Sequence, residues 1–195
     1  MIIFFDGVSG VGKTRFLDYC HRQYGITVFS IKQNMTWRHR EKAKEFLAYK
    51  NGLNSMEARL FYFDLWLQLC HEIIATSKDK KDLFFVDRSP VSTTLYNGDA
   101  TRVVEMTVKE LLHDRNIKTV LCDGNTNLVR KNKGLKSRDK LLDHSGIECS
   151  HMLKVWREYN PFCKEWDYVA HMVGYKDNPK RLFEHIISHL GIKIK

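Results

Sequence analysis

The sequence has few prolines, no low-complexity segment and no long apolar run. Three prolines in 195 residues leave no proline-rich linker along which the chain would divide into domains. No stretch reaches the roughly 18 consecutive apolar residues that suggest a membrane span, and the apolar start of the chain is short and lacks a basic region before it. We therefore expect one domain over residues 1–195, with no signal peptide and no membrane partner.

The sequence also lacks paired cysteines. Its five cysteines are an odd number without the spacing of a zinc site or a disulfide framework, and Cys20, Cys70 and Cys122 lie within apolar stretches. This usage is typical of buried free thiols in a reducing compartment. The sequence therefore predicts a cytoplasmic protein.

Acidic residues are fewer than basic ones. The chain has 23 Asp and Glu against 32 Lys and Arg, which gives a formal net charge of +9. This excess favours polyanionic partners such as nucleotides or nucleic acid, although a basic, well-solvated surface explains it equally well. The shares of hydrophobic residues (43%) and charged residues (28%) are ordinary for a globular protein. A homodimer is compatible with this composition, which does not determine the oligomeric state.

The first recognisable motif lies in the segment "IIFFDGVSGVGKTRFLD" near the N-terminus. Its apolar run, Ile2–Phe5, is typical of a buried strand, and Phe16, Leu17 and Cys20 share one face of a following helix. Between strand and helix, the chain has a glycine, four residues and then Gly-Lys-Thr. This is the pattern of a phosphate-binding loop (P-loop, or Walker A motif) in the structural context that it requires.

The glycines of this loop allow consecutive backbone N–H groups to surround an anion, and the start of the helix favours negative charge. We expect Lys13 to reach the β- and γ-phosphates of ATP, and the Thr14 hydroxyl to coordinate Mg²⁺. A glycine-rich turn with a solvated lysine is the alternative. The residues predicted to bind the nucleotide are Gly7, Val8, Ser9, Gly10, Val11, Gly12, Lys13 and Thr14.

Apolar runs and amphipathic segments alternate along the rest of the chain. Strands are predicted at Ile2–Phe5, Ile26–Ile31, Leu83–Val86, Lys118–Cys122 and Tyr168–Val173. Helices are predicted at Arg15–Arg22, Ser55–Ser77, Val103–Leu112, Ser150–Tyr159 and Lys180–Leu190. This order predicts an α/β protein with the three-layer fold of P-loop NTPases: a five-stranded parallel sheet, helices on both faces, and ligands at the carboxyl ends of the strands.

A second motif, "LFFVDRSP", places Asp87 and Arg88 at the carboxyl end of a predicted strand. A carboxylate at that edge can hold Mg²⁺, and the neighbouring arginine can bind a phosphate through two hydrogen bonds. Alone, such a pair is often a structural salt bridge. Together with the P-loop, it predicts that Asp87 is a metal ligand and that Arg88 is catalytic and binds substrate.

These motifs resemble the thymidylate kinase group of P-loop enzymes. Members of that group read approximately Asp-Arg-Tyr, two variable residues, Ser, a short apolar stretch and Tyr-Gln-Gly; this chain has Asp87-Arg88, Ser92 and Leu95-Tyr96-Asn97-Gly98 in the same order. The helix before it carries Leu-Leu-Phe-Ala-Ala-Asp-Arg in the family, matched here by "LFYFDL" at residues 60–65. The resemblance covers most of the chain and implies a Mg²⁺- and ATP-dependent kinase with Ser92 and Tyr96 at the substrate.

The deoxyribonucleoside kinases are a second group that this chain resembles. They have Glu-Arg-Ser at the position of Asp87-Arg88-Ser89 and, after their second strand, a Glu followed five residues later by a Trp. Here Trp37 is present, but Lys32 replaces the Glu. The chain departs from thymidylate kinases at Leu65, where that family has an arginine for the acceptor phosphate. We expect Lys32, Arg38 and Arg40 to replace this arginine.

The remaining predicted site residues come from the lid and from the surroundings of the acceptor. By resemblance, the basic segment "NLVRKNKGLKSRDK" within residues of about 128–142 is a lid with Arg130 and Arg138 as catalytic cations, although a solvated basic helix has the same composition. Asp6 and Glu41 are the carboxylates near enough to serve as a general base in catalysis. Phe61 and Trp37 are candidates to stack on the nucleobase of the substrate, although the aromatic pattern of helix 55–77 is mainly typical of packing in a hydrophobic core.

The preferred function is therefore the Mg-ATP-dependent phosphorylation of a deoxynucleoside monophosphate, most specifically dTMP to dTDP. A kinase of the same fold that acts on a deoxynucleoside or on a hydroxyl in DNA is the alternative. A non-catalytic ATP-binding protein is disfavoured, because Lys13, Thr14, Asp87 and Arg88 are all present. The base specificity cannot be read from the sequence.

Overall fold

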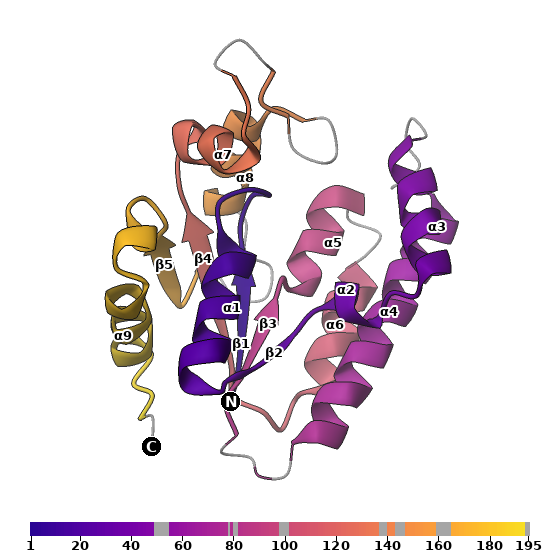
Figure 1. Ribbon diagram of the computed structural model, residues 1–195. Coiled ribbons are helices and arrows are strands. Elements are labelled where there is room, and N and C mark those ends of the chain that lie inside the picture. The colour runs from indigo at the N-terminus through magenta and orange to yellow at the C-terminus, as the bar shows by residue number, and fades with distance from the viewer. Residues whose placement is uncertain are drawn as a thin grey trace.

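Five parallel strands form the centre of the protein (Figure 1). The computed structural model describes residues 1–48, 55–77, 79, 82–97, 102–136, 140–142, 147–158 and 165–193. The strands are β1 (Ile2–Asp6), β2 (Thr27–Phe29), β3 (Phe84–Asp87), β4 (Ile117–Asp123) and β5 (Tyr168–His171). They lie in the order β2-β3-β1-β4-β5, and every neighbouring pair is parallel. The predicted fold class is therefore confirmed.

Strand β1 lies at the middle of the sheet and has apolar side chains on both faces. Ile2, Ile3, Phe4 and Phe5 are all fully buried, and burying each such side chain stabilises the fold by about 1.5–3 kcal/mol. The successive residues Phe4 and Phe5 point to opposite faces of the sheet. This arrangement explains why the strand reads as a continuous apolar run rather than as an alternating one.

Helices cover both faces of the sheet. On the Phe5 face lie α1 (Lys13–Tyr24), whose Phe16 ring is 6.1 Å from that of Phe5, and α9 (Pro179–His189), which is joined to α1 by the stacked rings of Tyr24 and Phe183. On the Phe4 face, α4 (Met56–Thr76) places the Trp66 ring 6.4 Å from that of Phe4. Helices α5 (Pro90–Asn97) and α6 (Arg102–Leu111) pack beside α4 (Figure 1).

The other helices lie around the carboxyl edge of the sheet. They are α2 (Ile31–Asn34), α3 (Trp37–Ala48), α7 (Thr126–Lys133), α8 (Cys149–Glu158) and the short 3₁₀ helix η3 (Tyr175–Asp177). Figure 1 shows α3 and α7 on opposite sides of this edge. No helix within the described ranges has both the length and the apolarity needed to cross a bilayer.

Two predicted strands are shorter than expected. The prediction for residues 26–31 is wrong at its end, because Ser30 caps the start of α2 instead. The Ser30 side chain accepts a hydrogen bond from the backbone N–H of Lys32, and the Gln33 side chain accepts one from the backbone N–H of Ser30. This reciprocal cap has the sequence signature Ser-x-x-Gln. Strand β5 ends at His171 rather than at Val173, before a turn at Gly174.

The described cysteines are free, as expected. Cys20, Cys70, Cys122 and Cys149 are buried and form no disulfide. Burial raises the pKa of the Cys70 thiol to about 12 and that of Cys122 to about 12 as well. These thiols therefore act as small apolar side chains in the core.

Candidate active site

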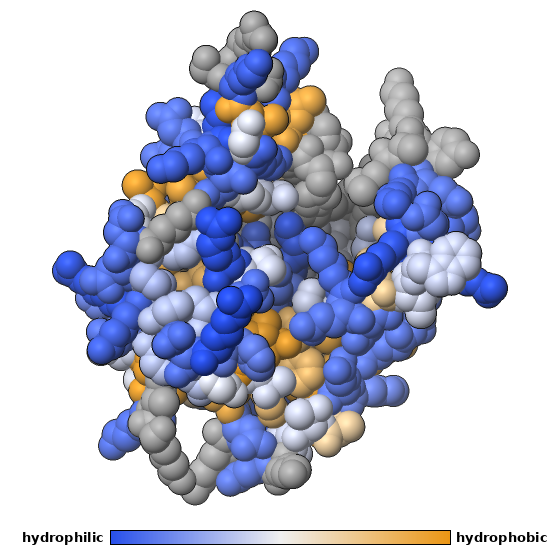
Figure 2. All heavy atoms as spheres, viewed as in Figure 1, coloured by the Kyte–Doolittle hydropathy of each residue, from blue (hydrophilic) through white to orange (hydrophobic). Residues whose placement is uncertain are grey.

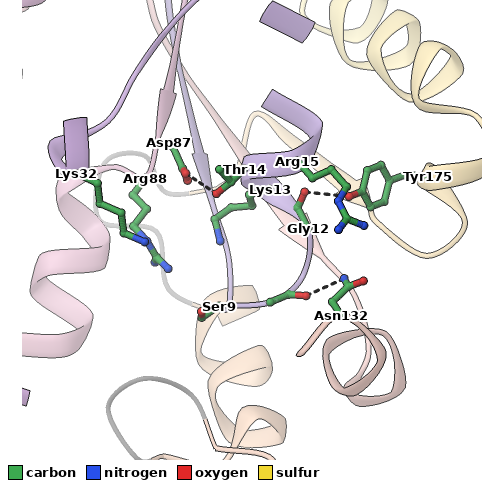
Figure 3. A pocket seen from close by; sticks show the side chains of 11 residues that line it. Ser9, Gly12, Lys13, Thr14, Arg15, Lys32, Asp87, Arg88, Asn132 and Tyr175 are labelled. Carbon is green, nitrogen blue, oxygen red and sulfur yellow. Dashed lines mark hydrogen bonds between the residues drawn. The ribbon is translucent and has the colours of Figure 1, made fainter. Parts of the chain in front are cut away.

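A pocket opens at the carboxyl ends of the strands (Figure 3), and it is lined by residues that end or follow each of the five strands. The loop after β1 forms its floor, Lys32 follows β2, and Asp87 and Arg88 end β3. Asn132 comes from the helix after β4, and Tyr175 comes from η3 after β5. The cavity measures about 220 Å³ and is lined by Ser9, Gly10, Gly12, Lys13, Thr14, Arg15, Lys32, Asp87, Arg88, Asn132 and Tyr175.

Two glycines allow the P-loop to pack closely against the rest of the protein. Gly7 has a φ of 129°, and a Cβ atom there would overlap the carbonyl oxygen of Cys122 on β4. Gly12 has a φ of 111°, and a Cβ atom there would lie 2.7 Å from the hydroxyl oxygen of Tyr175. Both positions combine a left-handed backbone with no room for a side chain. The spacing of the glycines in the motif therefore reflects the neighbours of the loop as well as the anion.

We expect Gly7→Ala to destabilise the protein far more than Gly25→Ala. Gly25 also has a positive φ, of 66°, but a Cβ atom there would meet nothing within 4 Å. Its substitution should cost only the backbone penalty of about 1–2 kcal/mol, whereas Gly7→Ala must also displace β4. Urea denaturation of the two variants measures the difference. Equal losses of unfolding free energy would show that the contact with Cys122 does not constrain the loop.

Lys13 is held inside the P-loop. Lys13 is only 5% exposed. Its Nζ donates hydrogen bonds to the carbonyl oxygens of Gly7 (2.8 Å) and Val8 (3.2 Å). Burial, followed by the nearby positive charge of Arg88, lowers the pKa of Lys13 from its ordinary value of 10.5 to about 8. A bound polyphosphate would oppose both effects, because negative charge favours the protonated amine.

This pKa predicts proton uptake on nucleotide binding. Above a pH of about 8, Lys13 of the free protein loses its proton, and a bound nucleotide polyphosphate such as ATP would restore it. The apparent affinity for ATP should therefore fall as the pH rises from 8 to 9.5, and the number of protons taken up should increase. Isothermal titration calorimetry in buffers of different ionisation enthalpy measures both. An affinity and a proton balance that stay constant over this range would contradict the prediction.

Thr14 and Asp87 form a pair of oxygen groups beside Lys13. The Thr14 hydroxyl donates a hydrogen bond of 2.7 Å to Oδ2 of Asp87 (Figure 3). A hydroxyl and a carboxylate oxygen at this spacing are suitable for Mg²⁺, which takes few protein ligands and completes its shell with phosphate and water. No cluster of three or more His, Cys, Asp or Glu side chains suited to a metal occurs in the described part of the chain. The two predicted metal ligands thus lie together.

Arg88 has a strained backbone. Its φ is 83°, and it is the only residue other than glycine with a positive φ among those described. The Arg88 N–H donates to the carbonyl oxygen of Phe5 (2.9 Å), and the next N–H, of Ser89, donates to Oδ1 of Asp6 (3.1 Å). Strain of this kind costs about 1–3 kcal/mol and persists where neighbouring contacts impose it. The result is that the Arg88 side chain enters the pocket.

Asp6 does not line the pocket in which sequence reasoning placed it. The residue is fully buried, and burial raises the pKa of its carboxyl group, although hydrogen bonds from Ser89 act in the opposite direction. Its observed contact is the one with Ser89. In this structure, Asp6 therefore supports the turn that presents Arg88.

Three pocket residues were not predicted from the sequence. Asn132 donates from Nδ2 to the carbonyl oxygen of Gly10 (2.8 Å), and the Tyr175 hydroxyl donates to the carbonyl oxygen of Gly12 (3.1 Å). Arg15 lies beside Tyr175 (Figure 3). Burial raises the pKa of Tyr175, and the positive charge of Arg15 opposes this rise. The position of Tyr175 directly after the last strand was the one signal in the sequence that could have indicated its role.

The predicted lid begins with α7. Asn125 caps this helix and Gly134 ends it, with a left-handed backbone at φ 66°. Arg130 does not line the pocket; its Nη1 donates to the carbonyl oxygen of Lys136 (2.6 Å). Arg138 lies outside the described residues. Asn132 therefore joins this segment to the P-loop by a hydrogen bond, and the side chains of Val129 and Lys133 also lie close to Gly10.

The predicted acceptor residues are dispersed. Lys32 lines the pocket, whereas Trp37, Arg38, Phe61 and Ser92 do not. The Phe61 ring instead packs between those of Phe46 and Tyr62, and the buried Ser92 hydroxyl donates to the carbonyl oxygen of Ser89. The side chain of Tyr96 lies outside the described residues.

The structure also describes the surroundings of three further residues near the predicted acceptor site. Leu65 is fully buried in the core. Glu41, a possible base, is exposed and pairs with Lys44 at 2.6 Å. Burial raises the pKa of the Tyr62 hydroxyl group, and the nearby charge of Arg88 opposes this rise. Tyr62 does not line the pocket.

Comparisons with known proteins identify the fold. No family model and no curated protein matches the sequence. Among solved structures, a thymidylate kinase from Candida albicans superposes with a TM-score of 0.61 at 12% identity, covering 96% of this chain and 92% of that one. A sugar kinase from Janibacter sp. HTCC2649 gives 0.55 at 15% identity, covering 98% and 94%. A shikimate kinase from Bacteroides thetaiotaomicron gives 0.53 at 12% identity, covering 98% and 99%. The chain therefore has the fold of P-loop kinases.

Proposed function

We propose that this protein is a Mg-ATP-dependent kinase that transfers a phosphoryl group to a deoxynucleoside monophosphate, with dTMP as the preferred acceptor. The arrangement of the pocket supports this function. Lys13 and the pair of Thr14 and Asp87 occupy its centre, with Lys32 and Arg88 on one side and Arg15 and Tyr175 on the other (Figure 3). In this proposal, the phosphates lie at the centre of the pocket, the donor nucleotide lies towards Arg15 and Tyr175, and the acceptor lies towards Lys32 and Arg88.

In the proposed reaction, the protein supplies positioning and positive charge. Lys13 would neutralise the charge on the transferring phosphoryl group. Thr14 and Asp87 would hold Mg²⁺, which would supply further positive charge at the phosphates. An oxygen of the acceptor phosphate forms the new bond to phosphorus as the bond to the ADP oxygen breaks. Lys32 and Arg88 hold the acceptor phosphate, and Arg15 and Tyr175 lie towards the nucleoside of the donor.

One observation carries the choice of a phosphate acceptor. Asp87 is the only carboxylate among the described residues that line the pocket, and it already accepts a hydrogen bond from Thr14. A hydroxyl acceptor needs a base, whereas a phosphate acceptor is already ionised near neutral pH. In addition, Nη1 of Arg88 is buried without a hydrogen-bond partner in the described structure. A phosphate oxygen would satisfy this donor.

The preference for dTMP rests on the resemblance of the Asp87–Gly98 motif to that of thymidylate kinases. The three similar structures carry the names of thymidylate, sugar and shikimate kinases, so the shared fold does not choose among acceptors. A coupled assay of ADP release should test deoxynucleoside monophosphates, nucleosides and oligonucleotides with a free 5′-hydroxyl. We expect dTMP to give the highest kcat/KM. A tenfold or greater preference for a nucleoside or an oligonucleotide would overturn the proposal.

Arg88 offers a test that separates its side chain from its backbone. Arg88→Ala and Arg88→Gly both remove the guanidinium group, so both should raise the KM for dTMP and lower kcat. Only glycine relieves the strain at a φ of 83°. Relief of about 1 kcal/mol would make the melting temperature of the glycine variant about 2–4 °C higher than that of the alanine variant. Enzyme kinetics and calorimetry measure the two effects. An unchanged KM in both variants would remove Arg88 from the acceptor site.

A further inference from the structure

The start of α3 exposes a large aromatic ring on a basic surface. Trp37 is 71% exposed, although it is the first residue of a helix that packs against α4. The buried side of α3 carries Phe46 and His39, whose rings lie 5.6 and 5.7 Å from that of Phe61. Trp37 and Phe46 are nine positions apart, and at about 100° per residue this separation places them on opposite sides of the helix. The indole therefore faces away from the core.

The charges of α3 divide into paired and unpaired groups. Lys42 pairs with Glu57 (2.7 Å) and Glu45 (3.3 Å), and Lys44 pairs with Glu41 (2.6 Å). In contrast, Arg38 and Arg40 are exposed and have no ion pair within the described structure. The Arg38 guanidinium lies 5.6 Å from the centre of the Trp37 ring. The carboxylates of this helix thus neutralise its lysines and leave its arginines unneutralised.

This surface continues into the active-site pocket. Lys32, on the preceding short helix, lines the pocket and also lacks an ion pair in the described residues. Residues 32 and 37 are joined by only five peptide units, which span at most about 18 Å. We refer to Lys32, Trp37, Arg38 and Arg40 as the Trp37 surface. It consists of one cation in the pocket and two on the first turn of α3, where the exposed indole also lies and where Arg38 is 5.6 Å from the centre of the indole ring.

We propose that the Trp37 surface binds single-stranded nucleic acid, with one base stacked on Trp37 and adjacent phosphates held by Arg38, Arg40 and Lys32. Stacking on an exposed aromatic ring, combined with cations that follow the backbone, is how proteins bind single strands without sequence preference. A mononucleotide bound in the pocket would occupy Lys32 and Arg88 but would leave Arg38, Arg40 and the indole unused. A chain of several nucleotides can contact all of them. This function is additional to the proposed kinase reaction and does not depend on it.

The same surface is poorly suited to a lipid bilayer. Helices that lie in a membrane interface carry an extended apolar face. Among the α3 side chains that the structure describes, Trp37 is the one large apolar residue that is exposed, and the surface over α3 is mainly hydrophilic (Figure 2). A flexible strand with regularly spaced phosphates fits this pattern better.

Intrinsic fluorescence of the full chain, without ATP, tests the proposal. Trp66 and Trp156 are each 1% exposed and Trp166 is partly buried, so quenching by a bound base should come mainly from Trp37. We expect a ten-nucleotide oligothymidylate to quench the emission, and a fluorescently labelled copy to bind Trp37→Ala at least tenfold more weakly than the unmodified protein. The logarithm of the affinity should decrease linearly with the logarithm of the salt concentration.

A pair of charge variants on the same helix provides the control. Arg38→Ser and Lys44→Ser remove the same charge, but only Lys44 is paired with a carboxylate. Arg38→Ser should reduce the salt slope by about 0.7, the value for one phosphate of a single strand, whereas Lys44→Ser should leave it nearly unchanged. Three results would overturn the proposal: no binding at low salt, equal effects of the two serine variants, or tighter binding to vesicles of anionic phospholipid than to the oligonucleotide. Because no turnover is measured, failure of the kinase proposal would not affect these outcomes.

Discussion

Lys13→Ala is expected to lower kcat by on the order of a thousandfold or more, because a fixed charge beside the transferring group supplies much of the catalysis in phosphoryl transfer. Nζ of Lys13 lies inside the loop, bound to the carbonyl oxygens of Gly7 and Val8, and is therefore positioned before any substrate arrives. Steady-state assays with ATP and the best acceptor measure the loss. Circular dichroism should remain nearly unchanged.

The stability of this variant provides a second, independent result. Since burial lowers the pKa of Lys13 to about 8, the folded protein holds this proton less tightly than the unfolded chain does. Between pH 8 and 10.5, the stability of the folded state should therefore rise with pH, and removing the lysine should abolish this contribution. Lys154→Ala, which alters an exposed lysine paired with Glu158, serves as the control for turnover. Wild-type turnover in Lys13→Ala would refute the role of the P-loop.

Asp87→Asn should lower kcat by on the order of a hundredfold or more and should raise the Mg²⁺ concentration required for half-maximal activity. The amide oxygen of asparagine can still accept the hydrogen bond from Thr14, so the variant removes the charge but keeps the local structure. Titration of Mg²⁺ at saturating ATP measures both changes. The melting temperature should change little in comparison with the loss of activity.

Asp123→Asn is the matched control for this variant. Asp123 ends β4 at the same edge of the sheet, but it pairs with Arg157 at 3.0 Å and does not line the pocket. Its substitution should affect stability more than turnover. If Asp87→Asn and Asp123→Asn behaved alike, with a lower melting temperature and normal kcat, Asp87 would be a structural residue rather than a metal ligand.

Sequence reasoning was most reliable where one strong local signal dominated. The apolar run of β1, the glycine pattern of the P-loop and the apolar strand before Asp87 predicted the centre of the sheet and the floor of the pocket. In these segments, burial of the side chains on both faces leaves little choice of structure. Helices α3 and α5 were not predicted. Phe46 is the one buried residue among the α3 side chains that the structure describes, and the segment has little apolar periodicity that could indicate a helix.

Residues that act through distant contacts could not be found in the sequence. Asn132 matters because α7 places its amide against Gly10, 122 residues away in the chain. Phe61 and Tyr62 are adjacent aromatic residues, and periodicity alone gave no reason to choose between them. In the structure, the Phe61 ring packs against those of Phe46 on α3 and of Tyr62, and neither Phe61 nor Tyr62 lines the pocket. The positions of both rings depend on the packing partners of α4, which the sequence does not identify.

The hydrogen bond from Tyr175 to Gly12 has a consequence for the synthesis of the protein. It joins residues that are 163 positions apart, so the P-loop is supported by a segment that is synthesised much later than the loop itself. Because domains form as the chain emerges and long-range contacts form late, a ribosome-bound chain that ends before η3 lacks this support for its P-loop. The P-loop therefore gains this support only after β5 and η3 have emerged, when all the strands of the sheet are present.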